Sequence, residues 1–142
     1  MEAIHQSIDI NGSMDSVFAY VENPSTHTQW LPSLMDIRHV TGSGTGQHYE
    51  WTYKMAGVPL EGQSTVIAHV PNERLVIRTK GSTEAVWTFV LAPRDGGTRL
   101  DLTVEYTIPL PVLGKLAEKL VVRRNERELA VAVQNIKDHC ES

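Results

Sequence analysis

Apolar and polar residues alternate along most of the chain, which is the pattern of β-strands with one buried face. Seven segments show it, at residues 3–10, 35–41, 47–55, 58–70, 74–80, 83–92 and 98–108. The links between the last six are short and rich in turn residues, and such links join antiparallel neighbours. The pattern therefore predicts a seven-stranded antiparallel sheet, bent enough to wrap around a helix.

Two short helical segments are predicted between the first and second strands. Ser13 is a favourable N-cap residue, and the helix that it starts must end before Pro24. Residues 24–32 have proline at both ends and predict a second helical turn, which presents Trp30 near its end. We expect this turn to form a lid or a plug at one corner of the sheet.

The end of the chain, residues 111–139, has no proline after its first residue and predicts one long helix. Its apolar residues form two sets at helical spacing: Leu113, Leu116, Ala117 and Leu120, then Val122, Leu129, Val133, Ile136 and Cys140. Nine steps of about 100° separate Leu120 from Leu129, which places the two sets on roughly opposite sides of a straight helix. The helix must therefore kink or bury both sides.

The strand register can be predicted at one hairpin. A two-residue turn at residues 56–57 places Trp51 opposite Gly62, where the indole fills the space left by the missing side chain. The face predicted to point inward carries Tyr49, Trp51, Tyr53, Val66 and Ala68, then Leu75, Ile77, Ala85, Trp87, Phe89, Leu91, Leu100, Leu102, Val104, Tyr106 and Ile108. Its hydroxyl and indole N–H groups need partners when buried. They either orient a ligand or belong to a closed core in which waters satisfy them.

The composition is that of an ordinary globular protein. The 142 residues are 41% hydrophobic and 21% charged, and we expect residues 1–142 to form a single domain. A formal net charge of −4 argues against nucleic acid as a partner, because phosphate binding needs a basic surface. The one basic cluster has both signs of charge and predicts a solvated helix face, formed by Arg123, Arg124, Glu126, Arg127 and Glu128.

Nothing in the sequence predicts a secreted or membrane-inserted chain. No stretch is long and apolar enough for stable membrane insertion, and the first residues lack the basic and apolar regions of a signal peptide. The single cysteine, Cys140, cannot form an internal disulfide, which is compatible with a reducing compartment. We therefore expect a cytoplasmic protein.

Few residues could carry catalysis. The six histidines show none of the spacings of metal sites, so we expect no metal and no cofactor. No nucleophile motif is present, and the acidic strand residues alternate onto the outer face: Glu50, Glu61, Glu84 and Asp101. His27 is the one histidine near the predicted lid. It is either a base beside a cavity or a surface residue, and the polar segment around it favours the surface.

The order of these elements resembles the START-like helix-grip fold, an α+β fold with two short helices after the first strand and a long C-terminal helix. Turn and packing signatures that match it are Ser16-Val-Phe18, Trp30-Leu-Pro32, Gly42 to Gly46, Gly57, Pro71-Asn-Glu-Arg-Leu75, Gly97-Thr-Arg99, Glu105-Tyr106 and Leu113-Gly-Lys-Leu116. The likeness covers almost the whole chain. More narrowly, the chain resembles the polyketide cyclase/dehydrase and lipid transport family of the SRPBCC superfamily.

The resemblance implies a deep cavity between the sheet and the C-terminal helix, which takes a hydrophobic ligand such as a lipid, sterol, polyketide or aromatic metabolite. The ligand-binding residues expected on this basis are Trp30, Tyr49, Trp51, Tyr53, Trp87, Phe89, Tyr106, Leu116 and Leu120. The late half of the helix would pack on the sheet, and Leu116 and Leu120 would roof the cavity or line its entrance.

Three classes of function stay open. The first is a carrier or sensor of a hydrophobic small molecule, which needs only the cavity and a movable lid. The second is a cyclase or dehydratase without metal or covalent nucleophile, in which Tyr49, Tyr53 or Tyr106 donates a hydrogen bond to a developing enolate. The third is an interaction or assembly module using exposed apolar residues at 112–122, and the exposed side of the Leu113 to Leu120 set would also suit a homodimer. A closed core favours the third class, an apolar cavity the first, and a cavity with convergent polar groups the second.

Overall fold

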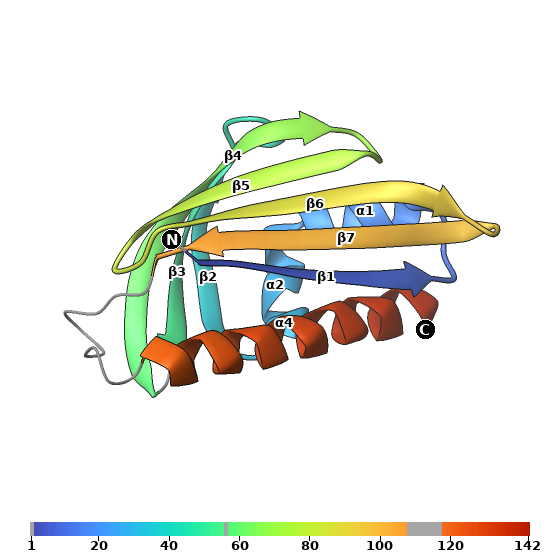
Figure 1. Ribbon diagram of the computed structural model, residues 1–142. Coiled ribbons are helices and arrows are strands. Elements are labelled where there is room, and N and C mark those ends of the chain that lie inside the picture. The colour runs from blue at the N-terminus through green and yellow to red at the C-terminus, as the bar shows by residue number, and fades with distance from the viewer. Residues whose placement is uncertain (1, 56, 108–117) are drawn as a thin grey trace.

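The computed structural model describes residues 2–55, 57–107 and 118–142 (Figure 1). Its strands form one seven-stranded antiparallel sheet in the order β1-β7-β6-β5-β4-β3-β2. The strands are β1 (Glu2–Ile10), β2 (Leu34–Thr41), β3 (His48–Met55), β4 (Val58–Val70), β5 (Arg74–Gly81), β6 (Ala85–Arg94) and β7 (Gly97–Tyr106). The predicted sheet is confirmed, with strand limits close to those expected.

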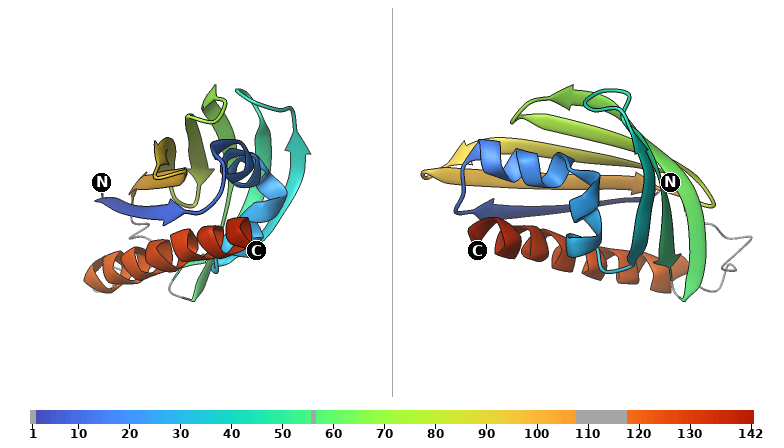
Figure 2. Two further views of the ribbon diagram at one scale, coloured as in Figure 1. Left: turned by 90° about the vertical axis from the view of Figure 1, so that its right-hand side faces the viewer. Right: turned by 180° about the vertical axis from the view of Figure 1, so that it is seen from behind.

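The helices are α1 (Met14–Glu22), α2 (His27–Trp30) and α4 (Glu118–Glu141), with a short 3-10 helix, η1 (Pro24–Thr26), before α2. The Ser13 side chain caps α1, as predicted. The sheet is strongly curved, α4 runs along β1, and α1 and α2 lie within the curve (Figure 2). None of the helices in the described part of the chain is long and apolar enough to cross a membrane.

Side chains after α1 bind its free carbonyl groups. Because α1 ends at Glu22, the carbonyls of its last turn lack helical partners. The Thr26 hydroxyl donates to the Tyr20 carbonyl at 2.7 Å, and the His27 ring donates to the Val21 carbonyl at 2.9 Å. These bonds hold the connection to α2 against the end of α1.

The predicted register of the β3–β4 hairpin is confirmed. Trp51 pairs with Gly62, and Tyr49 pairs with Ser64. A Cβ atom on Gly62 would lie 2.4 Å from Cζ2 of Trp51 and 2.4 Å from the carbonyl oxygen of Lys80. Only glycine therefore fits beneath this indole.

One part of the predicted inner face is wrong. The ladder between β4 and β5 shifts register between Val66 and Ala68. Beyond this bulge His69, and not Ala68, pairs with the core residue Leu75, and paired residues share a face of the sheet. His69 therefore points inward, where its ring packs edge-on against Phe18 with ring centroids 5.3 Å apart.

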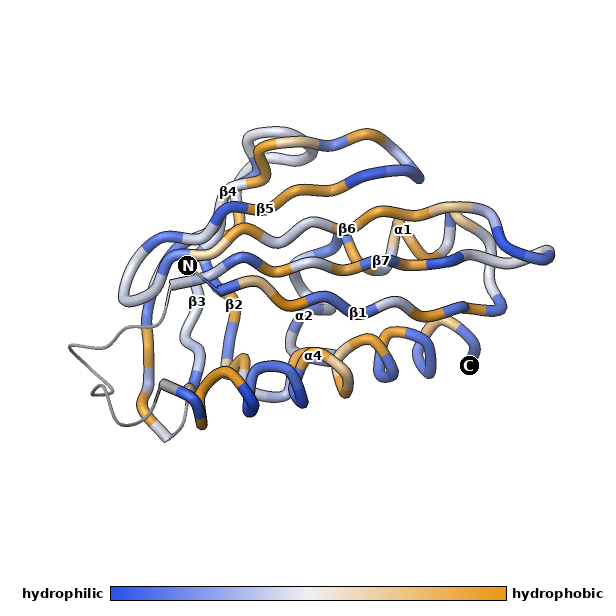
Figure 3. Tube along the Cα trace, viewed as in Figure 1, coloured by the Kyte–Doolittle hydropathy of each residue, from blue (hydrophilic) through white to orange (hydrophobic). Residues whose placement is uncertain are grey.

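Helix α4 places its buried residues on one side: Val121, Asn125, Glu128, Leu129, Ala132, Val133 and Ile136. In Figure 3 its hydrophobic positions face the sheet, and its hydrophilic positions face away. Leu129, Val133 and Ile136 belong to the core, as predicted. Val121 is the first fully buried residue of this side, whereas the expected Val122 is only partly buried.

The early apolar set of the helix is described only in part. Leu113, Leu116 and Ala117 lie outside the described residues. Leu120 is 68% exposed, because it lies about half a turn around the helix from Leu129. The expectation that the helix buries both sides is therefore wrong at Leu120.

Ile136 tests the packing of α4 on the sheet. Its side chain is fully buried, so Ile136→Val should lower the free energy of unfolding by about 1 kcal/mol through the loss of one methylene group. Val131→Ala, on the exposed side of the same helix, is the matched control and should change it by less than about 0.5 kcal/mol. Urea denaturation measures both variants. An equal loss in the two would contradict this placement of the helix.

Candidate functional site

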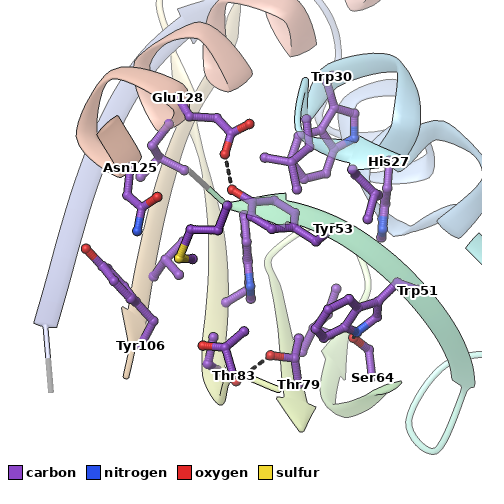
Figure 4. Close-up of a pocket in the computed structure, with 18 of the residues that line it drawn as sticks. His27, Trp30, Trp51, Tyr53, Ser64, Thr79, Thr83, Tyr106, Asn125 and Glu128 are labelled. Carbon is purple, nitrogen blue, oxygen red and sulfur yellow. Dashed lines mark hydrogen bonds between the residues drawn. The ribbon is translucent and has the colours of Figure 1, made fainter. Parts of the chain in front are cut away.

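The concave face of the sheet and α4 line a cavity of about 110 Å³ (Figure 4). Seven of the predicted ligand-binding residues line it: Trp30, Tyr49, Trp51, Tyr53, Trp87, Phe89 and Tyr106. Leu120 is not part of this lining, which places it away from the predicted roof, and Leu116 lies outside the described residues. A cavity of about 150 Å³ can hold benzene, so the present one has room for a molecule of roughly one ring.

Trp30 is the centre of an aromatic cluster in the cavity wall. Its buried indole stands edge-on to Trp87 and Phe89, with ring centroids 6.3 and 6.0 Å away. Asn135 of α4 donates a hydrogen bond to the Trp30 carbonyl at 3.2 Å. This bond fastens α2 to α4, so Trp30 corresponds to the predicted plug rather than to a loose lid.

Three hydroxyl side chains add polarity to the cavity lining: Ser64 on β4, Thr79 on β5 and Thr83 between β5 and β6 (Figure 4). The indole N–H of Trp51 donates to Oγ of Ser64 at 3.0 Å. The Thr83 hydroxyl donates to the Thr107 carbonyl at 2.8 Å. Ser64 and Thr83 are therefore engaged in hydrogen bonds within the protein. Trp51 is held both by its bond to Ser64 and by its close packing on Gly62.

A charged pair from α4 borders the cavity, which corrects the prediction of a wholly solvated face. The side chains of Arg124 and Glu128 are only 27% and 8% exposed, and Nη1 of Arg124 lies 3.1 Å from Oε1 of Glu128. The Ser33 N–H donates to Oε2 of Glu128 at 2.7 Å. The Tyr53 hydroxyl donates to Oε1 (Figure 4). Both side chains turn inward because Glu128 shares the buried side of the helix with Leu129.

The hydroxyl of Tyr53 is fully engaged in this cluster. It donates to Glu128 and accepts from Nη1 of Arg124 at 3.0 Å. Burial raises the pKa of Tyr53, so the phenol stays protonated at neutral pH. Arg124 also donates to the Lys54 carbonyl at 3.0 Å. The cluster therefore ties α4 to the end of β3 and fixes the Tyr53 ring in the cavity wall.

Removing the carboxylate tests this anchor. Glu128→Ala should lower the free energy of unfolding by about 2 kcal/mol, since the Ser33 N–H loses its acceptor and Arg124 its ion pair. The loss stays below that of a fully buried pair because solvent reaches part of Arg124. Glu126→Ala, on the exposed side of the helix, is the matched control. Thermal and urea unfolding measure both variants. An unchanged free energy of unfolding in Glu128→Ala would contradict the anchoring role of Glu128.

His27 lines the cavity and is only 5% exposed, so the surface position favoured from the sequence is wrong. Its Nε2 donates to the Val21 carbonyl, because a carbonyl oxygen only accepts, and Nδ1 is then unprotonated. Burial lowers the pKa of His27 to about 4. The ring is therefore neutral at neutral pH and is a weak base.

Tyr106 and Asn125 form a second polar spot in the lining. Oδ1 of Asn125 accepts from Nη1 of Arg124 at 2.7 Å, and the amide lies beside the Tyr106 hydroxyl (Figure 4). Within the part of the chain that the structure describes, the buried hydroxyl of Tyr106 and the indole N–H of Trp30 have no hydrogen-bond partner. Burial raises the pKa of Tyr106, so its hydroxyl keeps its proton.

Two of the polar cavity residues missing from the predicted set, Asn125 and Glu128, come from α4. They lie at helical spacing from Val121 and Leu129, on the same buried side. Polar residues at core positions of an amphipathic helix are a signal for a site. The charge pattern of the sequence instead predicts a solvated face for Glu128, and no role is predicted for Asn125. Among the described residues, no group of three or more His, Cys, Asp or Glu side chains could hold a metal ion.

A curved antiparallel sheet closed around a long C-terminal helix, with a cavity between them, defines the helix-grip fold. The family model described as polyketide cyclase/dehydrase and lipid transport matches residues 1–141. The chain therefore belongs to this family, and the resemblance seen in its sequence is confirmed.

Solved structures share the fold at low sequence identity. TTHA0849 from Thermus thermophilus has a TM-score of 0.82 at 18% identity, covering 96% of this chain and 95% of its own. The Zhui aromatase/cyclase from Streptomyces sp. R1128 has a TM-score of 0.79 at 14% identity, with 99% and 93% covered. The di-domain ARO/CYC StfQ from the steffimycin biosynthetic pathway has a TM-score of 0.78 at 16% identity, with 98% and 50% covered. No curated protein matches the chain by sequence.

Proposed function

We propose that this protein binds an apolar small molecule in the cavity between the sheet and α4, as a carrier or sensor. The observation that supports this most is the aromatic lining, which includes all three tryptophans of the sequence. Small-molecule sites are typically concave and apolar with a few placed polar groups, and this cavity has that composition. Membership of a family named for polyketide cyclisation and lipid transport agrees with it.

The binding free energy would come from apolar surface removed from water, at about 25 cal/mol per Å². The wall is held in place before binding by the hydrogen bonds that Asn135 donates to the Trp30 carbonyl and that the Trp51 indole donates to Ser64. A preorganised site loses little free energy to ordering when the ligand enters. With a volume of about 110 Å³, the cavity suits one ring, and a larger ligand requires the wall to move.

Native mass spectrometry of freshly purified protein, followed by extraction, tests the proposal. We expect a co-purifying apolar molecule. Ala85→Leu should prevent its retention, because Ala85 lines the cavity and a larger side chain fills it. Ala130→Leu, on the exposed side of α4, is the matched control and should retain the molecule. Equal retention by both variants would place the ligand elsewhere and contradict the proposal.

A cyclase or dehydratase is the second candidate, supported by the polar groups of the lining and by the names of two structural neighbours. Tyr106 is better suited than Tyr53 to stabilise an enolate, because the Tyr53 hydroxyl is already bonded to Glu128. His27 is poorly suited as a general base, since its pKa of about 4 makes it weakly basic.

Assays of cyclisation and dehydration with a short aromatic polyketide precursor test this candidate. Turnover that falls about tenfold or more in Tyr106→Phe would support it. His27→Ala should turn over at the wild-type rate if the ring takes no part in proton transfer. If the wild-type protein shows no turnover, the cyclase or dehydratase candidate is contradicted and the carrier or sensor function remains.

A further inference from the structure

We infer that the ligand is a neutral molecule that carries a hydrogen-bond acceptor, such as the carbonyl oxygen of an aromatic ketone. This inference rests on the proposed function and narrows it, because it separates neutral ketones from fatty acids and amines. Two independent features of the described lining carry it: a surplus of hydrogen-bond donors and the absence of an unpaired charge.

The indole groups provide the first part of the donor surplus. Among the described residues, Trp51 is the only tryptophan whose N–H has an acceptor, the hydroxyl of Ser64. The buried N–H group of Trp30 has none there. An indole nitrogen donates and never accepts. Such groups gain a hydrogen bond only when a ligand or a water brings an acceptor.

Asn125 and Tyr106 enlarge the surplus. Arg124 already donates to Oδ1 of Asn125. The Tyr106 hydroxyl has no partner in this arrangement. Even if the Asn125 amide turned to donate to it, the hydroxyl hydrogen and the second amide hydrogen would be left. If the hydroxyl donates to Oδ1 instead, both amide hydrogens are left, so roughly two donors stay available either way. A ligand oxygen placed here satisfies them, whereas an apolar group that displaces water leaves them unpaired at a cost.

The charges of the described lining are all compensated. Glu128 is paired with Arg124 at 3.1 Å and accepts from the Ser33 N–H. His27 is neutral, because burial lowers its pKa to about 4. A carboxylate ligand would lose its hydration without meeting a free cation, and an ammonium ligand would reach Glu128 only by displacing Arg124. Burying an unpaired charge is strongly unfavourable, so both ligand types are disfavoured.

Calorimetric titration with four single-ring probes tests the inference. Acetophenone is neutral with an acceptor, ethylbenzene is similar in shape without one, benzoate is an anion and benzylamine is a cation. Acetophenone and ethylbenzene should bind, and the two ions should bind at least about 100-fold more weakly. Tyr106→Phe and Asn125→Leu should each weaken acetophenone relative to ethylbenzene by about fivefold. Tyr20→Phe, whose hydroxyl binds Gln29 away from the cavity, should leave that ratio unchanged.

The outcomes separate this inference from the proposed function. Benzoate binding as tightly as acetophenone would overturn the inference, and so would an unchanged ratio in both cavity variants. Ethylbenzene binding without acetophenone binding would also overturn it, while the proposed apolar site would stand. If no probe binds the wild-type protein, the proposed function fails and the inference fails with it.

Discussion

Replacing Gly62 with alanine is expected to lower the free energy of unfolding by at least about 3 kcal/mol. The new Cβ would lie 2.4 Å from the Lys80 carbonyl oxygen, which belongs to the backbone of the neighbouring strand and cannot rotate away. It would also lie 2.4 Å from Cζ2 of Trp51. The indole would be pushed from its place in the cavity wall, so ligand binding should weaken as well.

Gly12→Ala is the matched control for this substitution. A Cβ at Gly12 would meet its nearest atom, Oγ of Ser16, at 3.6 Å, which is an ordinary contact. Its unfolding free energy should therefore change by less than about 0.5 kcal/mol. Urea denaturation of both variants gives the comparison. A Gly62→Ala protein as stable as Gly12→Ala would show that Trp51 does not lie over Gly62.

The stability of the protein should fall between pH 6.5 and about pH 4 because of His27. The unfolded chain binds a proton at the ordinary pKa of 6.5, whereas burial lowers the pKa of the folded state to about 4. The contribution is fully present above pH 6.5 and is lost as the pH falls through the folded pKa. Its size is up to about 3 kcal/mol.

His27→Gln isolates this contribution. The glutamine amide can still donate to the Val21 carbonyl, as the ring does at 2.9 Å, but it does not titrate. Chemical denaturation at several pH values should show a shallower loss of stability in the variant over this range. Carboxyl groups titrate in both proteins, so the difference between the two curves belongs to His27. Parallel curves would contradict the buried neutral ring.

The strands could be predicted because a period of two residues forces apolar side chains onto one face. The match of Trp51 to Gly62 then followed from the length of one turn. Ala68 was misplaced because a bulge moves every later residue of the strand to the opposite face, and nothing in the local sequence marks it.

The polar residues of the site could not be predicted from the sequence for a different reason. In the sequence, the neighbours of His27 are polar. In the structure its ring is buried, because the end of α1 leaves the Val21 carbonyl without a helical partner and the ring binds it. Glu128 looks like one member of a charged helix face, and it turns inward because Ser33, Tyr53 and Arg124 supply its donors. The Glu128 placement depends on contacts with segments distant in the sequence, and the His27 placement depends on how the chain turns back onto the end of α1. A local pattern of polar and apolar residues contains neither.

The indole N–H signals of the three tryptophans give the most direct test of a ligand-binding cavity, because Trp30, Trp51 and Trp87 all line it. ¹⁵N-labelled protein should be titrated with ethylbenzene while these NMR signals are followed. Saturable shifts in the wild-type protein and in Ala130→Leu, together with their loss in a folded Ala85→Leu, are the predicted result. Unmoved indole signals in the wild-type protein, or equal shifts in Ala85→Leu, would contradict the account.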